Sequence, residues 1–300
     1  MIKQLGVLTL LLGYFMIFAA NNVQADNLKE NVRLKEVEKV LRDQNRRDWS
    51  KSPPEEHAED LKYLGDTAIP LLATFLEDYD LGYDASETML VINANKSAPL
   101  IFDSMPKSNR NVQYQTFRYF IRKIQNGEPF DFSVKMHAAA VRCLNADTNA
   151  DAAVKALLAI GLTGDEKDFP ILERFYNNKH QTSVWKTRLR NASQAALARL
   201  GAQKYIQLTR DALHKPVPKS LTMDRGIEIS NLLKIASFSG NKQFIPLLCK
   251  HLDDPYVRDY DAGVSPASDA AEALDLLINN LTEFRLSSVE SWKGKCMSMR

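Results

Sequence analysis

The residues best suited to chemistry in this chain are its histidines and the carboxylates near them. Five histidines, at positions 57, 137, 180, 214 and 251, are spread over 300 residues. His251 stands two residues before Asp253, a pairing that would suit a general base. His251 also occupies a position that aromatic residues hold in related segments, which favours a buried core histidine. We therefore interpret His251 as structural and expect no catalytic residue, metal ion or cofactor.

Other catalytic patterns are also missing from the sequence. The segment Asp259-Tyr260-Asp261-Ala262-Gly263 begins like a calcium loop, but it lacks the third acidic ligand and the glutamate at the required distance. The sequence contains no HExxH, no phosphate-binding glycine loop, no Gly-x-Ser-x-Gly and no CxxC. These absences favour a binding protein over an enzyme.

Charge is distributed in blocks although the formal net charge is only +2. Residues 55–100 and 251–285 are mainly acidic, whereas residues 170–225 are mainly basic. In the basic block, Trp185 precedes Lys186, Arg188 and Arg190 at the start of an expected helix. An aromatic residue beside three cations would suit an acidic protein, an anionic glycan or a lipid headgroup. A solvated helix face explains the same residues equally well.

Two acidic segments containing tyrosine form a second set of binding candidates. Residues 77–84 read EDYDLGYD and residues 253–261 read DDPYVRDYD. Both are expected to connect the two helices of a unit, where loops commonly take part in protein recognition. Turns that only increase solubility are the alternative. The candidates in the second segment are Tyr256, Arg258 and Tyr260, with the acidic residues Asp253, Asp254, Asp259 and Asp261.

The elements that would position these residues follow a repeated pattern. A proline is followed at once by two aliphatic residues, and by apolar residues five and six positions later. The pattern starts at Pro70, Pro170 and Pro246, with a weaker copy at Pro99. Proline suits the first turn of a helix, where its missing N–H has no intrahelical partner. Each copy therefore predicts the first helix of a unit.

A second pattern marks the second helix of each unit. Two apolar residues three positions apart are followed by a small residue, which is expected to let the chain turn into the next unit. The marks are about 28 to 42 residues apart, within the range of helical repeats. They are Gly65, Asn93, Ile121, Gly161, Gly201, Ala236 and Ile278. No long stretch shows strand alternation, so the sequence predicts an all-α fold.

The last full unit resembles a HEAT repeat of the lyase-like subtype. In such repeats an acidic turn is followed by valine and arginine at the start of the second helix, and then by an alanine-rich face. The matching residues are Asp253, Asp254, Val257, Arg258, Ala270, Ala271, Ala273 and Leu274, with an insertion after Arg258. The resemblance implies a right-handed α-solenoid of about six to seven helical pairs. First helices would line its convex side and second helices its concave side.

The enzymes of the HEAT group do not fit this chain. Its iron-binding hydroxylases use His-Glu pairs, and the sequence has no His-Glu dipeptide. Its bilin lyases act in the cytoplasm and its DNA glycosylases need DNA. Neither setting agrees with the export signal that the N-terminus predicts.

The two ends of the chain have their own predicted roles. Residues 1–25 read as a signal peptide, with Lys3 before an apolar stretch and small residues ahead of a cleavage site after Ala25. An uncleaved N-terminal anchor is the alternative. Residues 26–54 are expected to form a capping helix and linker, residues 55–285 the repeat array and residues 286–300 a polar tail. Trp292 is the only large anchor of that tail.

The three cysteines cannot all pair within one chain. Cys249 and Cys296 could form a disulfide that attaches the tail to the last repeat. Alternatively, Cys143 and Cys249 are buried thiols that behave as small hydrophobic residues.

Taken together, these patterns predict an exported, periplasmic or secreted protein that binds another protein and has no cofactor. It would act as a scaffold, an inhibitor or an immunity-type protein. We expect no nucleic-acid partner and no membrane anchor once the signal peptide is removed. A module that binds glycans or lipid headgroups is the main alternative, and an envelope enzyme is the next.

Overall fold

The computed structural model describes residues 33–43, 62–146, 149–177, 183–215, 222–259, 262–279 and 288–298. The predicted signal peptide lies outside the described residues, as does most of the predicted linker. No helix within the described ranges is long and apolar enough to cross a membrane. The chain divides into two compact units, Met1–Leu100 and Ile101–Arg300, which are described separately.

The first unit contains short helices and helical turns, followed by the first part of a longer helical segment. Residues 33–43 form the helix expected near the N-terminus, and they bury Val37 and Leu41. The Arg33 guanidinium donates a hydrogen bond to the Thr67 hydroxyl over 3.0 Å, which attaches this helix to the next segment. The elements that follow are η1 (Lys62–Leu64), η2 (Asp66–Ala68), α3 (Ile69–Ala73) and α4 (Gly82–Ser104).

Helix α4 is interrupted at Asn93, one of the residues that mark unit boundaries in the sequence. Asn93 has extended backbone angles, φ −163° and ψ 94°. Its side-chain oxygen accepts a hydrogen bond from the Lys96 backbone N–H over 3.2 Å, as an N-cap does. Its amide nitrogen donates to Asp66, which also pairs with Lys96. Asn93 therefore ends one helix and starts the next.

The second unit is a series of helices that pack against one another. Its elements are α5 (Arg110–Gln125), α6 (Ser133–Asn145), α7 (Ala150–Thr163), η3 (Glu166–Asp168), α8 (Phe169–Tyr176), α9 (Ser183–Arg199), α10 (Gln203–His214), α11 (Met223–Ser239), η4 (Lys242–Phe244), α12 (Ile245–Lys250), η5 (His251–Asp253), β1 (Val257–Asp259), β2 (Ala262–Val264), α13 (Pro266–Leu274), η6 (Asp275–Asn279) and α14 (Val289–Ser298). The all-α class is confirmed, apart from the short strands β1 and β2.

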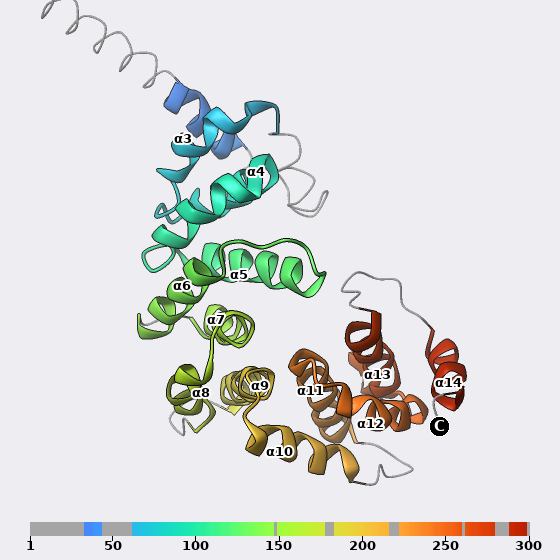
Figure 1. The fold of residues 1–300 in the computed structure, drawn as a ribbon. Helices are drawn as coiled ribbons and strands as arrows, with labels where there is room; N and C mark the ends of the chain where they lie inside the picture. The colour runs from blue at the N-terminus through green and yellow to red at the C-terminus, as the bar shows by residue number, and fades with distance from the viewer. Residues whose placement is uncertain are drawn as a thin grey trace, which may run out of the picture. The chain divides into compact units, whose positions relative to one another are not determined.

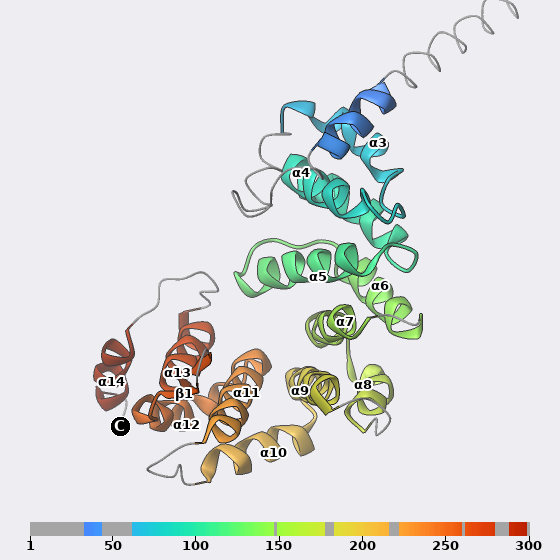
Figure 2. The same cartoon turned by 180° about the vertical axis from the view of Figure 1, so that it is seen from behind.

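The helices of this unit are ordered by their contacts. Each of α5, α7, α9, α11 and α13 packs against the next in that order, and α6, α8, α10 and α12 pack against members of this row. Figures 1 and 2 show α7, α9, α11 and α13 side by side. These four helices carry the second-helix pattern of the sequence, and they pack against one another as one row.

Three first helices have the local structure that proline predicts. In α3, α8 and α12, a proline occupies one of the first two helical positions, directly after a short 3-10 turn. The first turn needs no proline N–H, and the ring fixes φ near its helical value. The weaker copy differs, because Pro99 lies inside α4.

The small residues that mark the units have two different roles. Gly65 and Gly201 have positive φ, 66° and 89°, and turn the chain as predicted. For Gly161 and Ala236 the prediction was wrong, because both lie inside helices, α7 and α11. A Cβ on Gly161 would come 2.7 Å from the Ala196 Cα, so this glycine brings α7 and α9 close together. Helix α11 ends instead at Gly240, in the left-handed conformation.

The expectation that Val257 and Arg258 start the second helix was wrong, because both lie in strand β1 and α13 begins only at Pro266. Strands β1 and β2 form an antiparallel hairpin, in which Val257 pairs with Val264. The hairpin packs against α11, where Val257 lies 3.4 Å from the position of a Cβ on Gly226. Sequence patterns did not predict these strands, since each has only three residues. The segment that resembles a calcium loop overlaps this hairpin, with Tyr260 and Asp261 outside the described residues. No group of three possible metal ligands occurs among the residues that are described.

The C-terminal segment is attached covalently. Cys249 in α12 and Cys296 in α14 form a disulfide, so of the two alternatives the bridge is present. Trp292 of α14 is fully buried. Cys143 is a buried free thiol in α6, and its burial raises its pKa to about 12. It therefore behaves as a small hydrophobic residue.

Candidate functional site

The histidine that could act as a base is a core residue. His251 is 3% exposed, and its Nδ1 lies 2.6 Å from Oδ2 of Asp254, whereas the ion-pair partner of Asp253 is Lys293. Its Nε2 lies 3.1 Å from the Leu213 carbonyl oxygen. Both ring nitrogens thus have oxygen partners inside the protein. The structural interpretation of His251 is confirmed.

The acidic turn after α12 is partly used in internal contacts. The carboxylate of Asp254 contacts the His251 ring, and Asp253 forms an ion pair with Lys293 of α14 over 3.0 Å. Tyr256 is 62% exposed. Arg258 and Asp259 belong to β1, but their side chains lie outside the described set, as do Tyr260 and Asp261 entirely. The related turn that contains Tyr79 belongs to the other unit.

The basic segment at the start of α9 does not form one surface. Arg190 stacks on the Tyr176 ring, 4.9 Å from its centroid, and donates a hydrogen bond to its hydroxyl over 3.1 Å. Arg188 pairs instead with Asp151 of α7 over 2.8 Å. Lys186 is exposed, and the side chain of Trp185 is not among those described. Arg188 and Arg190 therefore contact different neighbouring helices.

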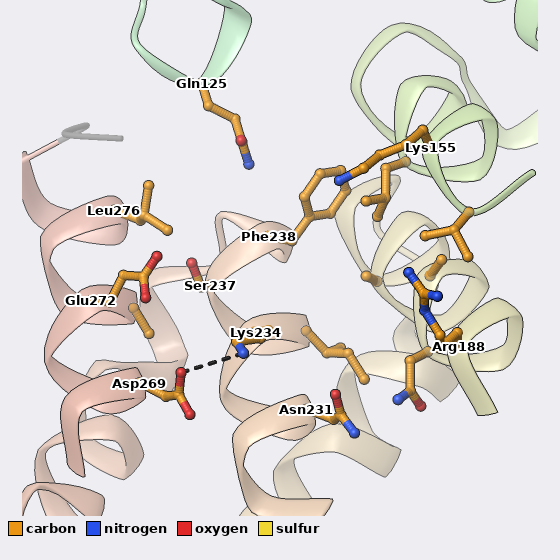
Figure 3. A pocket seen from close by; sticks show the side chains of 17 residues that line it. Gln125, Lys155, Arg188, Asn231, Lys234, Ser237, Phe238, Asp269, Glu272 and Leu276 are labelled. Carbon is orange, nitrogen blue, oxygen red and sulfur yellow. Dashed lines mark ion pairs between the residues drawn. The ribbon is translucent and has the colours of Figure 1, made fainter. Parts of the chain in front are cut away.

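Arg188 lines a pocket of about 420 Å³ on the row of second helices. Residues from α7, α9, α11 and α13 surround it, and Gln125 at the end of α5 contributes from one side (Figure 3). A smaller hollow of about 280 Å³ between α11 and α13 shares Asn231, Lys234 and Asp269 with it. The pocket is thus lined by four helices that pack against one another in a row.

The floor of the pocket is apolar. Ala195 of α9 and Ile235 and Phe238 of α11 form a buried cluster, against which Leu158 and Leu162 of α7 pack. The close approach of α7 to α9 at Gly161 brings these side chains together. An apolar floor with a few polar groups above it is typical of binding pockets.

The walls of the pocket carry opposite charges. Lys155 and Arg188 lie on the side of α7 and α9, whereas Asp269 and Glu272 lie on the side of α13 (Figure 3). Lys234 pairs with Asp269 over 3.4 Å, and its own side chain is 64% exposed. Such an exposed pair contributes little to stability. The pocket thus has basic side chains on one side and acidic side chains on the other, and some of them are paired within the protein.

Lys155 is the residue that sequence reasoning missed. Its pKa is lowered to about 8, first by burial and then by Arg118, Arg122 and Arg188, while Asp151 opposes the shift. The signal for it was present, because Lys155 is the only charged residue between Asp151 and Asp165. A lone cation among buried alanines of an amphipathic helix can be found from sequence alone.

The groups around the pocket suit binding. Neither histidine nor cysteine is among its lining residues in the described part of the chain, and Ser237 is the only hydroxyl there. Its amides, Asn191 and Asn231, add hydrogen-bond donors and acceptors between the charged walls.

Comparisons with protein-family models, with curated proteins and with solved structures find no match for this chain.

Proposed function

We propose that this protein is an exported, non-enzymatic α-solenoid of HEAT-like helical pairs that binds another protein through its row of second helices. It would serve as a scaffold, or as an inhibitor or immunity-type protein. The observation that carries the proposal is the pocket of about 420 Å³, which has an apolar floor and walls of opposite charge. Successive second helices supply it, and such stacked units commonly present extended binding surfaces.

A protein partner fits this pocket better than a polyanion does. A protein surface can offer apolar, acidic and basic side chains within a short distance, and complementary charges fix its register. A glycan or lipid headgroup of uniform negative charge would match Lys155 and Arg188 but would be repelled by Asp269 and Glu272. The arrangement of charges therefore favours a protein over the polyanion alternative.

Reversing one charge on each wall separates these two functions. The mature chain is used to capture partners from a cell-envelope extract, with Arg188→Glu and Glu272→Lys as the test variants. A protein partner held in fixed register is lost with either variant, because each removes one half of the charge match. A polyanion is lost with Arg188→Glu but held more tightly by Glu272→Lys.

The matched control is Lys186→Glu, which reverses an exposed charge two residues from Arg188 but outside the pocket lining. A stoichiometric protein that Lys186→Glu retains, and that both pocket variants lose, supports the proposal. Stronger capture of an anionic glycan or of anionic vesicles by Glu272→Lys would replace it with the polyanion function. Equal capture by all three variants would exclude this pocket as the binding site.

A further inference from the structure

The pocket on the row of second helices adjoins the smaller hollow between α11 and α13. The pocket has a volume of about 420 Å³ and the smaller hollow one of about 280 Å³. Asn231 and Lys234 of α11 and Asp269 of α13 line both of them, so they meet at the Lys234–Asp269 pair. Together they form a site that suits an elongated ligand better than a compact one.

Only some of the charged side chains in the pocket remain available to a ligand. Arg188 is paired with a carboxylate of α7 over 2.8 Å, and Lys234 is paired with Asp269 over 3.4 Å. Within the described ranges, Lys155 and Glu272 form no ion pair. The charges that the protein leaves without an ion pair are therefore one cation on α7 and one carboxylate on α13.

These two charges lie on opposite sides of the apolar floor. Figure 3 shows Phe238 between Lys155 and Glu272, which all line the pocket. The Lys155 amine lies 5.3 Å from the centroid of the Tyr114 ring. Burial lowers its pKa to about 8, so the amine is mostly charged at neutral pH. A ligand that crosses the pocket thus meets a positive charge, an apolar surface and a negative charge in that order.

We infer that the pocket and the smaller hollow bind an extended peptide segment of the partner, in which an acidic, an apolar and a basic side chain share one face. The acidic group lies against Lys155, the apolar group against Phe238 and the basic group against Glu272. Alternate residues of an extended chain face the same side, so the three side chains are expected at alternate positions. This inference rests on the proposed function, and it names the kind of sequence that the partner presents.

The amides and hydroxyl groups of the site suit the backbone of such a segment. Asn191 and Asn231 line the pocket, and an amide side chain both donates and accepts hydrogen bonds. In the smaller hollow, Ser265 donates a hydrogen bond to Ser268 over 2.8 Å, and Ser230 lies on the facing helix α11. Hydroxyl groups also donate and accept, so this hollow suits backbone amides and small polar side chains. We therefore expect small polar residues at the end of the segment that enters it.

A displayed library of random peptides, selected on the mature chain at neutral pH, tests this order of side chains. The natural chain should enrich peptides with an acid, an apolar residue and a base at alternate positions, in one fixed order along the peptide. The double variant Lys155→Glu with Glu272→Lys exchanges the two charges and should enrich the opposite order. The matched control Lys186→Glu reverses an exposed charge outside the pocket lining and should enrich the same peptides as the natural chain.

Titration of one selected peptide, followed by fluorescence anisotropy, makes the result quantitative. Lys155→Glu should weaken binding by about tenfold, because it replaces attraction of the acidic group with repulsion. The double variant should prefer the same peptide with its two charges exchanged. Glu272→Lys changes an exposed side chain, so its smaller loss of about threefold remains measurable if Lys155→Glu fails to fold.

Three outcomes would overturn the inference. They are the enrichment of the same peptides by the natural chain and the double variant, the absence of any enrichment, and a peptide cut after its basic residue that binds as tightly as the full one. The last result would show that a compact zwitterion fills the pocket alone. The proposed function would survive each of them if capture from the envelope extract still loses its partner with Arg188→Glu and Glu272→Lys.

Discussion

The middle of the second unit and its C-terminal helix are stabilised in different ways. In the middle, α7 and α9 approach so closely that a Cβ on Gly161 would collide with Ala196. At the C-terminal end, α14 buries Trp292 and Cys296 and is joined to α12 by the disulfide. Close packing between neighbouring helices of the row α7, α9, α11 and α13 therefore needs small residues at the points of contact. A helix with few buried residues is held instead by one large anchor and a covalent bond.

Two lysines show the same difference in electrostatic terms. In the middle, Lys155 is surrounded by cations and its pKa is lowered to about 8. At the C-terminal end, hydrogen bonds to Asp253 and Glu290 raise the pKa of Lys293. Lys293 is thus stabilised in its charged form by neighbouring carboxylates, whereas the charged form of Lys155 carries an electrostatic cost.

The largest expected effect is at the C-terminal end. Replacing both cysteines, Cys249→Ser with Cys296→Ser, opens a closed segment whose ends are 47 residues apart. Loop entropy predicts a loss of about 4 kcal/mol in the free energy of unfolding. Urea denaturation measures the loss, and hydrogen exchange should show α14 opening first. A reducing agent should reproduce the effect in the natural chain and add nothing in the variant.

In the middle of the unit, the largest effect should come from Gly161→Val. The new side chain would meet the backbone of Ala196, so α7 and α9 must move apart. Overpacking of this kind should cost about 3 kcal/mol of unfolding free energy, measured by urea denaturation. A variant as stable as the natural chain would show that the α7–α9 contact is loose, and the comparison with α14 would fail.

Lys155→Met should stabilise the middle of the unit when no ligand is present. A lysine whose pKa is depressed on folding destabilises the fold at low pH, and the cost disappears as pH rises from the folded pKa of about 8 to the unfolded value. At pH 7 the gain should be on the order of 2 kcal/mol, and near pH 11 it should vanish. Thermal unfolding across this pH range measures it. Lys293→Met is the control, and it should destabilise the protein at neutral pH because that lysine is paired.

The smallest effect is expected for Gly294→Ala in α14. No atom lies within 4 Å of a Cβ at this position, so the substitution meets no steric obstacle. Alanine favours a helix over glycine by about 1 kcal/mol at most, and α14 should become more stable by up to that amount. Hydrogen exchange within α14 is the sensitive measurement. A loss of stability here would mean that α14 is packed as closely as the middle row.

The sequence predicted the helices well because apolar spacing and proline position are local signals. Pro70, Pro170 and Pro246 all begin helices, and Gly65 and Gly201 turn the chain as expected. Gly161 was misread because an apolar pair followed by a small residue describes two situations, the end of a helix and a close contact between helices. Only the position of the neighbouring helix distinguishes them.

The candidate site was predicted only in part. Arg188 was named from its charge and does line the pocket, but Arg190 faces Tyr176, since residues two apart in a helix point to different sides. Asp253 and Asp254 were expected in a binding turn, yet both are engaged by Lys293 and His251. Lys293 lies far from Asp253 in the sequence, so a local pattern cannot contain that partner.

The disulfide between Cys249 and Cys296 also has a mechanical consequence. A chain pulled from its two ends would transmit force directly from α12 to α14 through the sulfur atoms, and the hairpin and α13 would carry no tension. An extended chain reaches about 3.4 Å per residue. The disulfide bridges residues that are 47 positions apart, so it prevents roughly 160 Å of chain extension while it is intact. A reducing agent releases this length. When the protein is unfolded by force, its last segment would therefore extend less in an oxidising compartment than in a reducing one.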